Sequence, residues 1–286
     1  MNTLPTNNNL PDRMLKYFSW ACGLFIILFF GYLFFDILSQ GISRINISFF
    51  SDTPINAGRQ GGIAPMLVST LLILILCLAI SLPIGIAAAI YLAEYTNEQQ
   101  GFTRLIRRSL NIIAGVPSII MGLFGYAFFV ISLKLGFSLL SGALTLACMV
   151  LPLLIRNIED SLRSIPQSYR LNAHALGLSQ WRTIFQILLP MASQGILLAI
   201  ILSIGRAMAE TAALLYTSGY VMRMPDSIMD SGRSLSVHIF DLSMNVAGGE
   251  QSAYASALTL IVLLLIINTT TTVLSRIFTS KNYIHH

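Results

Sequence analysis

The chain has 286 residues, of which 55% are hydrophobic and only 10% are charged, and its mean hydropathy is +0.74. A soluble domain usually carries about a quarter charged residues, so this composition excludes a soluble domain and predicts a protein built for lipid. The formal net charge of +5 does not indicate a nucleic-acid partner, because the basic residues do not gather in soluble patches interleaved with aromatic residues. The basic cytoplasmic loops of a membrane protein explain this charge better.

Six segments are long and apolar enough to cross a bilayer as helices, which takes about 20 residues each. They lie at about 17–38, 65–92, 111–133, 138–156, 190–217 and 254–278. The first segment follows the polar leader MNTLPTNNNLPDRMLK. We interpret it as a retained helix, because its apolar stretch is too long for a signal peptide and no small-x-small cleavage site follows. The chain is therefore predicted to be an all-α integral membrane protein with six transmembrane helices.

The basic residues orient these helices, because cytoplasmic loops of membrane proteins carry an excess of lysine and arginine. With the N-terminus inside, eleven basic residues fall on the inner side and five on the outer side, while Arg206 stays within a span. Both termini are therefore predicted to be cytoplasmic. The inner group comprises Arg13, Lys16, Arg104, Arg107, Arg108, Arg156, Arg163, Arg170, Arg182, Arg276 and Lys281, and the outer group comprises Arg44, Arg59, Lys134, Arg223 and Arg233.

The predicted organisation alternates membrane segments with polar connections. Its parts are a cytoplasmic tail (1–16), a first transmembrane helix (17–40), an external loop (41–62), a transmembrane domain (63–278) and a cytoplasmic tail (279–286). The transmembrane domain contains a cytoplasmic loop at 157–189 and an external loop at 218–253. In the external loop, Leu235, Ile239 and Leu242 are spaced like one face of a short helix, which we expect to lie along the outer membrane surface.

The three cysteines, Cys22, Cys77 and Cys148, all fall within hydrophobic runs. No CxxC or Cys/His spacing typical of a metal site accompanies them. They are interpreted as small apolar core residues rather than as a disulfide or a metal site.

The loop between the fourth and fifth predicted spans reads IRNIEDSLRSIPQSYRLNAHALGLSQWRTIFQILLP. Pro166 suits the first turn of a helix, where an N–H has no partner, and Gly177 suits the left-handed position just past a helix end. Ser179 can cap the helix that follows. These signals predict a short helix at about 166–176. It is either an ordinary amphipathic connector or a projecting helix that fits a groove in a cytoplasmic partner.

The spacing of this loop resembles the EAA loop of ABC importer permeases, which reads Glu-Ala-Ala, three residues, a glycine, and a closing Ile-x-Leu-Pro. In this chain residues 171–173 stand at the triplet, Gly177 stands at the glycine, and residues 187–190 stand at the close. The resemblance implies that the loop docks on an ATPase subunit. The docking residues it implies are Arg170, Leu171, Asn172, Ala173, Ala175, Leu176 and Gly177. Leu171 replaces the family's glutamate, so any polar contact of that glutamate is absent here or is supplied by another residue.

Four further stretches, in the right order along the chain, resemble the PstA-type permeases of phosphate ABC importers. They are GGIAPMLVSTLLILILCLAISLPIGIAAAIYLAEYT, AGVPSIIMGLFG, GRAMAETAALLYTSG and SLSVHIF. The resemblance implies a type I ABC importer permease fold, a multi-pass location in the bacterial plasma (inner) membrane, and a permease subunit that carries out no catalysis. The partners it implies are a homologous second permease, two cytoplasmic ABC ATPase subunits, an external phosphate-binding protein, inorganic phosphate and membrane lipid.

The chain itself is expected to bind no cofactor. It contains no GxxxxGK[ST] phosphate-binding loop. ATP and magnesium are therefore expected on the partner ATPase subunits, and no nucleic acid is expected as a partner.

Arg206 and Glu210 stand inside one of the most apolar stretches, and Arg206 lies near the midpoint of the predicted fifth span. Two charges facing lipid at that depth would cost roughly 5–7 kcal/mol, so we expect both to face protein or water. Their spacing of four residues predicts an ion pair on one helical face. A purely structural pair is one interpretation, although a buried pair contributes little net stability. The other is a substrate path, in which the guanidinium fork binds phosphate oxygens.

The residues proposed for that path are Arg206, Glu210 and Thr211, with Tyr216 and Thr217 as further polar candidates. Glu210 could orient Arg206, weaken phosphate binding to allow release, or accept a hydrogen bond from protonated phosphate. For Thr211, Tyr216 and Thr217, ordinary hydrogen bonding between helices is an equally good interpretation.

Three alternatives remain at the level of sequence. A permease for molybdate, tungstate or sulfate would share the loop but is not expected to share GRAMAET. A proton-coupled secondary carrier could use Glu210 as a relay, yet it would have no use for a docking loop. A membrane-embedded hydrolase lacks a nucleophile elbow, an HExxH motif or paired catalytic carboxylates.

Overall fold

A computed structural model of the chain describes residues 10–97 and 100–282, and the side chains of residues 13–97 and 100–273. The predicted tail at 1–16 lies largely outside the described residues. Of the predicted tail at 279–286, residues 283–286, with the terminal histidine pair, lie outside them.

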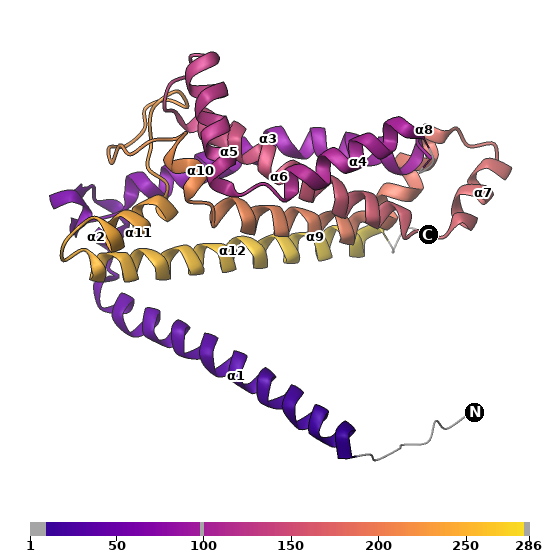
Figure 1. Cartoon of the computed structure of the whole chain (residues 1–286). Coiled ribbons are helices and arrows are strands. Elements are labelled where there is room, and N and C mark those ends of the chain that lie inside the picture. The colour runs from indigo at the N-terminus through magenta and orange to yellow at the C-terminus, as the bar shows by residue number, and fades with distance from the viewer. Residues whose placement is uncertain (1–9, 98–99, 283–286) are drawn as a thin grey trace.

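Four long helices form the body of the molecule. They are α3 (Ala64–Glu94), α6 (Leu139–Arg163), α9 (Leu189–Met208) and α12 (Glu250–Asn282). Figure 1 shows them running side by side. A fifth helix, α1 (Leu10–Gly41), diverges from this bundle and meets it only near its C-terminal end, where Gly41 lies against the backbone of Tyr254.

Within the described part of the chain, five helices are long and apolar enough to cross a membrane. The number is six if the bent pair Gly101–Ala114 and Ser118–Ser132 counts as one span. This agrees with the six predicted spans. Helix α6 is central to the packing: 67% of its most apolar stretch is buried, compared with 28% in α3 and 0% in α1. The apolar surface of α1 is therefore left for lipid or for a partner protein.

The predicted third span, 111–133, is wrong at its start. An amphipathic helix, α4 (Gly101–Ala114), precedes α5 (Ser118–Gly125) and the π-helical turn η3 (Tyr126–Ser132), and the two parts meet at an angle of 103°. The break falls at residues 115–117. Pro117 has no backbone N–H to donate and disfavours helical geometry in the residue before it, which ends α4 there.

The predicted fifth span, 190–217, is wrong at both ends. The continuous helix begins with α8 (Gln180–Thr183), widens into the π-helical turn η4 (Ile184–Leu188), and ends with α9 at Met208. Pro190 interrupts the ladder of helical hydrogen bonds, and a π turn just before it accommodates the missing donor. A separate short helix, α10 (Ala212–Leu215), follows after a break.

One end of the bundle is covered by the segments between α1 and α3 together with α11 (Leu235–Met244). The first group comprises η1 (Ile42–Arg44), α2 (Ile47–Ser51), β1 (Pro54–Ile55), η2 (Asn56–Gly58) and β2 (Gln60–Gly61). The two strands are antiparallel, with Pro54 opposite Gly61. A small second core of Phe49, Ile63, Met66, Leu235 and Ala255 joins these parts.

The short helix predicted around Leu235–Leu242 is present as α11, and its place along the outer membrane surface stays a prediction. Leu235, Val237 and Leu242 are fully buried, and α11 packs on α12 and α3. Its periodicity thus reflects a core contact within the protein.

All three cysteines are free thiols in the structure. Cys77 is buried and Cys148 is half-buried, as expected of small core residues, but Cys22 is exposed on α1. The core interpretation is therefore wrong for Cys22, because α1 has no neighbouring helix along most of its length.

Candidate functional site

The chain breaks helical geometry between α9 and α10, next to the residues predicted to form the substrate path. The last turn of α9 contains Arg206, and Ala209 caps that helix by donating its N–H to the carbonyl of Gly205. Ala207 and Met208 line a small cavity together with Leu146. Leu146 comes seven residues after the start of α6 at Leu139, or about 10 Å along that helix. The break thus lies inside the bundle and not at its end.

The predicted ion pair between Arg206 and Glu210 is not formed, because α9 ends between the two residues. A carboxylate oxygen of Glu210 instead accepts a hydrogen bond of 3.4 Å from the N–H of Ala213, at the start of α10. The backbone carbonyl of Glu210 accepts a hydrogen bond of 2.7 Å from the hydroxyl of Ser236 on α11. Glu210 is therefore held at the N-terminus of a helix, where a negative charge is favourable.

Arg206 lies in the C-terminal turn of α9, where a positive charge is favourable. Its side chain is exposed, as are Leu198 and Leu202, which precede it on the same face of α9. The structure describes no side-chain partner for Arg206 within this chain. A cation on an otherwise apolar helix face, well inside the bundle's length, requires cover by another protein or by water.

The other polar candidates near the break differ in access. Thr211 and Tyr216 are half-buried. Thr217 is fully buried, and its hydroxyl donates to the carbonyl of Ala213 one turn earlier. Its hydroxyl is thus engaged within the chain, so Thr211 and Tyr216 are the candidates with access to a solute.

The second candidate site is the loop helix α7 (Gln167–Ala175), which projects beyond the body of the bundle (Figure 1). Pro166 lies just before its first residue, as predicted within one position. Gly177 has a φ of +75°, Leu178 donates to the carbonyl of Ala173, and Gly177 donates to that of His174. These bonds form the left-handed helix end that the glycine predicted. Ser179 caps α8 by accepting from the N–H of Arg182, which confirms that prediction.

Most of the predicted docking residues lie on the outer surface of α7 and of the turn that follows it. Leu171 is 61% exposed and Leu176 is 80% exposed, although both are apolar. Asn172, His174, Ala175 and Gly177 are exposed as well, whereas Ala173 is buried. An exposed apolar helix face of this kind is suited to a groove in a partner protein.

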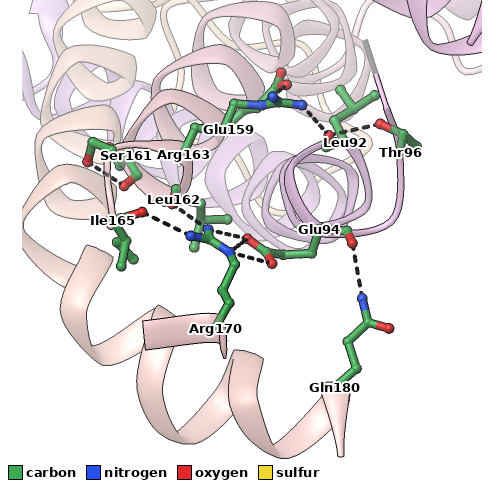
Figure 2. Close-up of polar contacts among 11 residues, drawn as sticks. Leu92, Glu94, Thr96, Glu159, Ser161, Leu162, Arg163, Ile165, Arg170 and Gln180 are labelled. Carbon is green, nitrogen blue, oxygen red and sulfur yellow. Dashed lines mark hydrogen bonds and ion pairs between the residues drawn. The ribbon is translucent and has the colours of Figure 1, made fainter. Parts of the chain in front are cut away.

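Arg170 differs from the other predicted docking residues, because its guanidinium points back toward the bundle. It forms an ion pair with Glu94 at the end of α3, with its Nη2 atom 2.6 Å and its Nε atom 3.0 Å from the two carboxylate oxygens. It also donates to the carbonyls of Leu162 and Ile165, each at 2.9 Å. Figure 2 shows this arrangement. Arg170 therefore holds the loop in place and leaves little of its charge for a partner.

Two further contacts hold the same end of α3. The side-chain amide of Gln180 donates to the backbone carbonyl of Glu94 at 3.0 Å, and Arg163 donates to the carbonyl of Leu92 at 2.9 Å. Figure 2 shows both. Arg163 also pairs with Glu159, which pairs with Arg107 of α4. A polar network thus joins α3, α4, α6 and the loop at this end of the bundle.

The sequence analysis missed Glu94, although one signal pointed to it. A carboxylate in the last turn of a helix lies next to the negative end of the helix dipole, which is unfavourable unless a cation is close. The position of this carboxylate predicts a basic partner. It does not show which residue is the partner, because Arg170 is distant in the sequence.

Known proteins resemble this chain in sequence and in fold. Residues 81–282 match the family described as "Binding-protein-dependent transport system inner membrane component". The "Phosphate transport system permease protein PstA" of Yersinia pestis is 32% identical over 251 residues, which are 87% of this chain and 84% of that protein. The "Probable ABC transporter permease protein YqgI" of Bacillus subtilis (strain 168) is 29% identical over 250 residues, 83% of this chain and 85% of that protein.

Among solved structures, a chain of a bacterial alginate ABC transporter, crystallised with an alginate-bound periplasmic protein, has a similar fold. The TM-score is 0.70 at 15% sequence identity, and the match covers 94% of this chain and 96% of that one. At this identity the match shows the fold alone. It confirms the predicted ABC importer permease fold.

Proposed function

This chain belongs to the family of inner membrane components of binding-protein-dependent transport systems, and on that basis we propose that it is the permease subunit of an ATP-driven phosphate importer. It forms half of the transmembrane path for phosphate and is itself not catalytic. ATP and magnesium are bound by cytoplasmic ATPase subunits, and an external binding protein delivers phosphate.

The observation that supports an anionic substrate is the place of Arg206. Its guanidinium is exposed at a helix break inside the bundle and has no described partner in this chain. A guanidinium presents a planar fork of donors that matches two oxygens of a phosphate group. Broken helices whose ends face a central path are a recurrent way to build ion sites in transporters.

One arginine cannot balance a phosphate dianion, and the exposed face of α9 that carries it needs cover. A second, homologous permease meets both needs, because it can seal this face and supply further basic residues. The largely exposed α1 is also consistent with a protein partner within the membrane.

Glu210 is held apart from Arg206 by its bond to the start of α10, so the structure gives no support to a role in orienting that arginine. Its half-buried carboxylate is placed beside the same break. In the proposed site it accepts a hydrogen bond from protonated phosphate. This contact favours phosphate over sulfate, which carries no proton to donate at neutral pH.

In this proposal α7 and the turn that follows it dock on the ATPase, with Leu171 and Leu176 as their most exposed apolar side chains. Closure of two ATPase subunits on ATP would displace α7 and change the side on which the path is open. The inner and outer sides follow from the distribution of basic residues.

The test is to purify this chain with its partner subunits from membranes and to measure ATP hydrolysis with the binding protein and phosphate, sulfate or molybdate. Stimulation by phosphate alone is expected. If sulfate or molybdate stimulates ATP hydrolysis and phosphate does not, the stimulating anion is the substrate in place of phosphate. Transport by this chain alone, driven by a proton gradient, would favour the secondary carrier.

A further inference from the structure

We propose that the Arg170–Glu94 ion pair positions α7 against α3 and carries the displacement of α7 to α3 during transport. This inference rests on the proposed docking of α7 on an ATPase. It assigns Arg170 a positioning role within the permease, distinct from the docking role that the loop pattern implied.

The first argument concerns how α7 is attached. Among its nine residues, only Ala173 is buried. An open cleft of about 600 Å³ lies between the loop and the end of α3, and its lining includes Arg170, Thr96 and Gln180. Little apolar packing therefore fixes the orientation of α7. Directional polar contacts must fix it instead, and a two-pronged arginine–carboxylate pair is among the most directional.

The second argument concerns burial. The side chain of Arg170 is only 15% exposed and that of Glu94 only 7% exposed, in contrast to the exposed pair of Arg223 and Asp226 at the other end of the molecule. A pair shielded in this way is little weakened by salt. Removing one partner would leave the other charge buried and unpaired.

The third argument concerns chain connectivity. Helix α7 is joined to α6 through residues 164–166 and to α9 through α8, so any movement of α7 reaches those two helices along the backbone. Helix α3 has no such connection to α7. Among the described residues, the bonds that Arg170 and Gln180 make to Glu94 connect the loop to the end of α3.

Helix α3 is also the element through which a movement at this end would reach the rest of the bundle. It packs along the length of α6, where Gly85 permits close approach of Leu154. At its other end, the hydroxyl of Thr70 accepts a hydrogen bond from the N–H of Leu235 in α11. A displacement of Glu94 therefore moves α3, which contacts both ends of the molecule.

The test uses the assembled complex with Glu94→Gln, Arg170→Gln and the double variant. We expect all subunits to copurify and basal ATP hydrolysis to persist. Stimulation by the loaded binding protein, and phosphate uptake, should each fall about tenfold, a change typical of coupling between sites. The double variant should lose no more than either single variant, because both remove the same interaction.

Thr96→Val is the matched control. It removes a buried hydrogen bond of 2.9 Å to the carbonyl of Leu92 at the same end of α3 but leaves the ion pair intact. Its stimulation ratio should equal that of the unaltered complex. If Arg170→Gln does not accumulate, Arg170→Lys keeps the charge and loses the fork. It should show a smaller loss of stimulation than Glu94→Gln.

Unchanged stimulation in Glu94→Gln with the complex intact would overturn the proposal. Loss of the ATPase subunits from Arg170→Gln but normal stimulation in Glu94→Gln would also overturn it, since Arg170 would then be a direct docking residue. If the unaltered complex responds to another oxyanion, the phosphate proposal fails, and the same variants test the ion pair with that anion.

Discussion

Arg206 is the residue whose loss should separate transport from assembly. Arg206→Gln keeps a polar side chain of similar length but removes the charge, so phosphate loses donors worth about 1.5–3 kcal/mol each to a charged group. Phosphate uptake by cells should be abolished while the complex still copurifies. Arg104→Gln, which alters an exposed arginine on α4, is the control and should retain uptake. Near-normal uptake by Arg206→Gln would refute its role in the path.

His238 should make one end of the molecule sensitive to acid. It is 1% exposed, both ring nitrogens lack a hydrogen-bond partner, and Gly58 lies against the ring. The pKa of His238 is lowered from 6.5 to about 4, first by burial and then by the charge of Arg233, while Asp241 opposes the shift. The folded state therefore favours the neutral ring.

Because the folded pKa lies below the unfolded value, this contribution to stability is complete above pH 6.5 and is lost as the pH falls toward about 4. The loss is on the order of 3 kcal/mol. Thermal unfolding in detergent at pH 7.5 and pH 5 should show about 2 kcal/mol of this loss. His238→Leu should flatten the difference, whereas the exposed His174→Gln should leave it unchanged. Equal pH dependence in both variants would contradict the assignment.

The end of α7 depends on a backbone shape that only glycine adopts easily. A Cβ added at Gly177 would meet no atom within 4 Å, so any effect of substitution comes from its φ of +75° and not from crowding. Gly177→Val should distort the turn between α7 and α8 and weaken ATPase docking. Copurification and phosphate-stimulated ATP hydrolysis measure this.

Gly101→Val is the matched control for Gly177→Val, because Gly101 is equally uncrowded and lacks a positive φ. It should retain coupling. Phosphate-stimulated ATP hydrolysis that is unchanged in Gly177→Val would count against docking through this loop.

Helices α5 and α10 cross closely at Gly122. A Cβ there would lie 2.8 Å from the Cα of Ala213, which is backbone and cannot move aside cheaply. Gly122→Ala should destabilise the folded protein by about 1–3 kcal/mol, as overpacking does. Gly115→Ala is the control, since its nearest atom would be 3.5 Å away. Similar melting temperatures for the two variants would show that the crossing tolerates added volume.

The molecule carries α7 at one end and α11 at the other, and the distribution of basic residues predicts which end faces the cytoplasm. The end with α7 should be inside and the end with α11 outside. Alkaline phosphatase fused after Ala247, in the turn before α12, should be active because it folds only outside. The same enzyme fused after His174, on α7, should be inactive. The reverse result would invert the predicted topology.

The sequence predicted correctly the helices that consist of one uninterrupted apolar stretch long enough to cross a membrane. The span predicted at 65–92 is α3, and the one at 254–278 lies within α12. The turn at Gly177 was also predictable, because a left-handed helix end depends on local backbone sterics. Leu171, a docking residue implied by the resemblance of the loop, is exposed in the structure, and its docking stays a prediction.

The breaks at 115–117 and 209–211 were not predicted, because the segments around them are apolar enough on average to be assigned to single spans. An apolar average does not distinguish one straight helix from two bent halves. The predicted pairing of Arg206 with Glu210 failed for this reason, because their spacing brings them together only if the helix continues.

Composition, apolar length and local turn chemistry thus determine the membrane class, the helix count and the loop helix, because each depends on residues close in the chain. The partners of buried charges are decided in three dimensions. Glu94 meets Arg170, and Glu159 meets Arg107. A buried charge needs a counter-charge nearby in space, and only the packing of distant helices determines which residue supplies it.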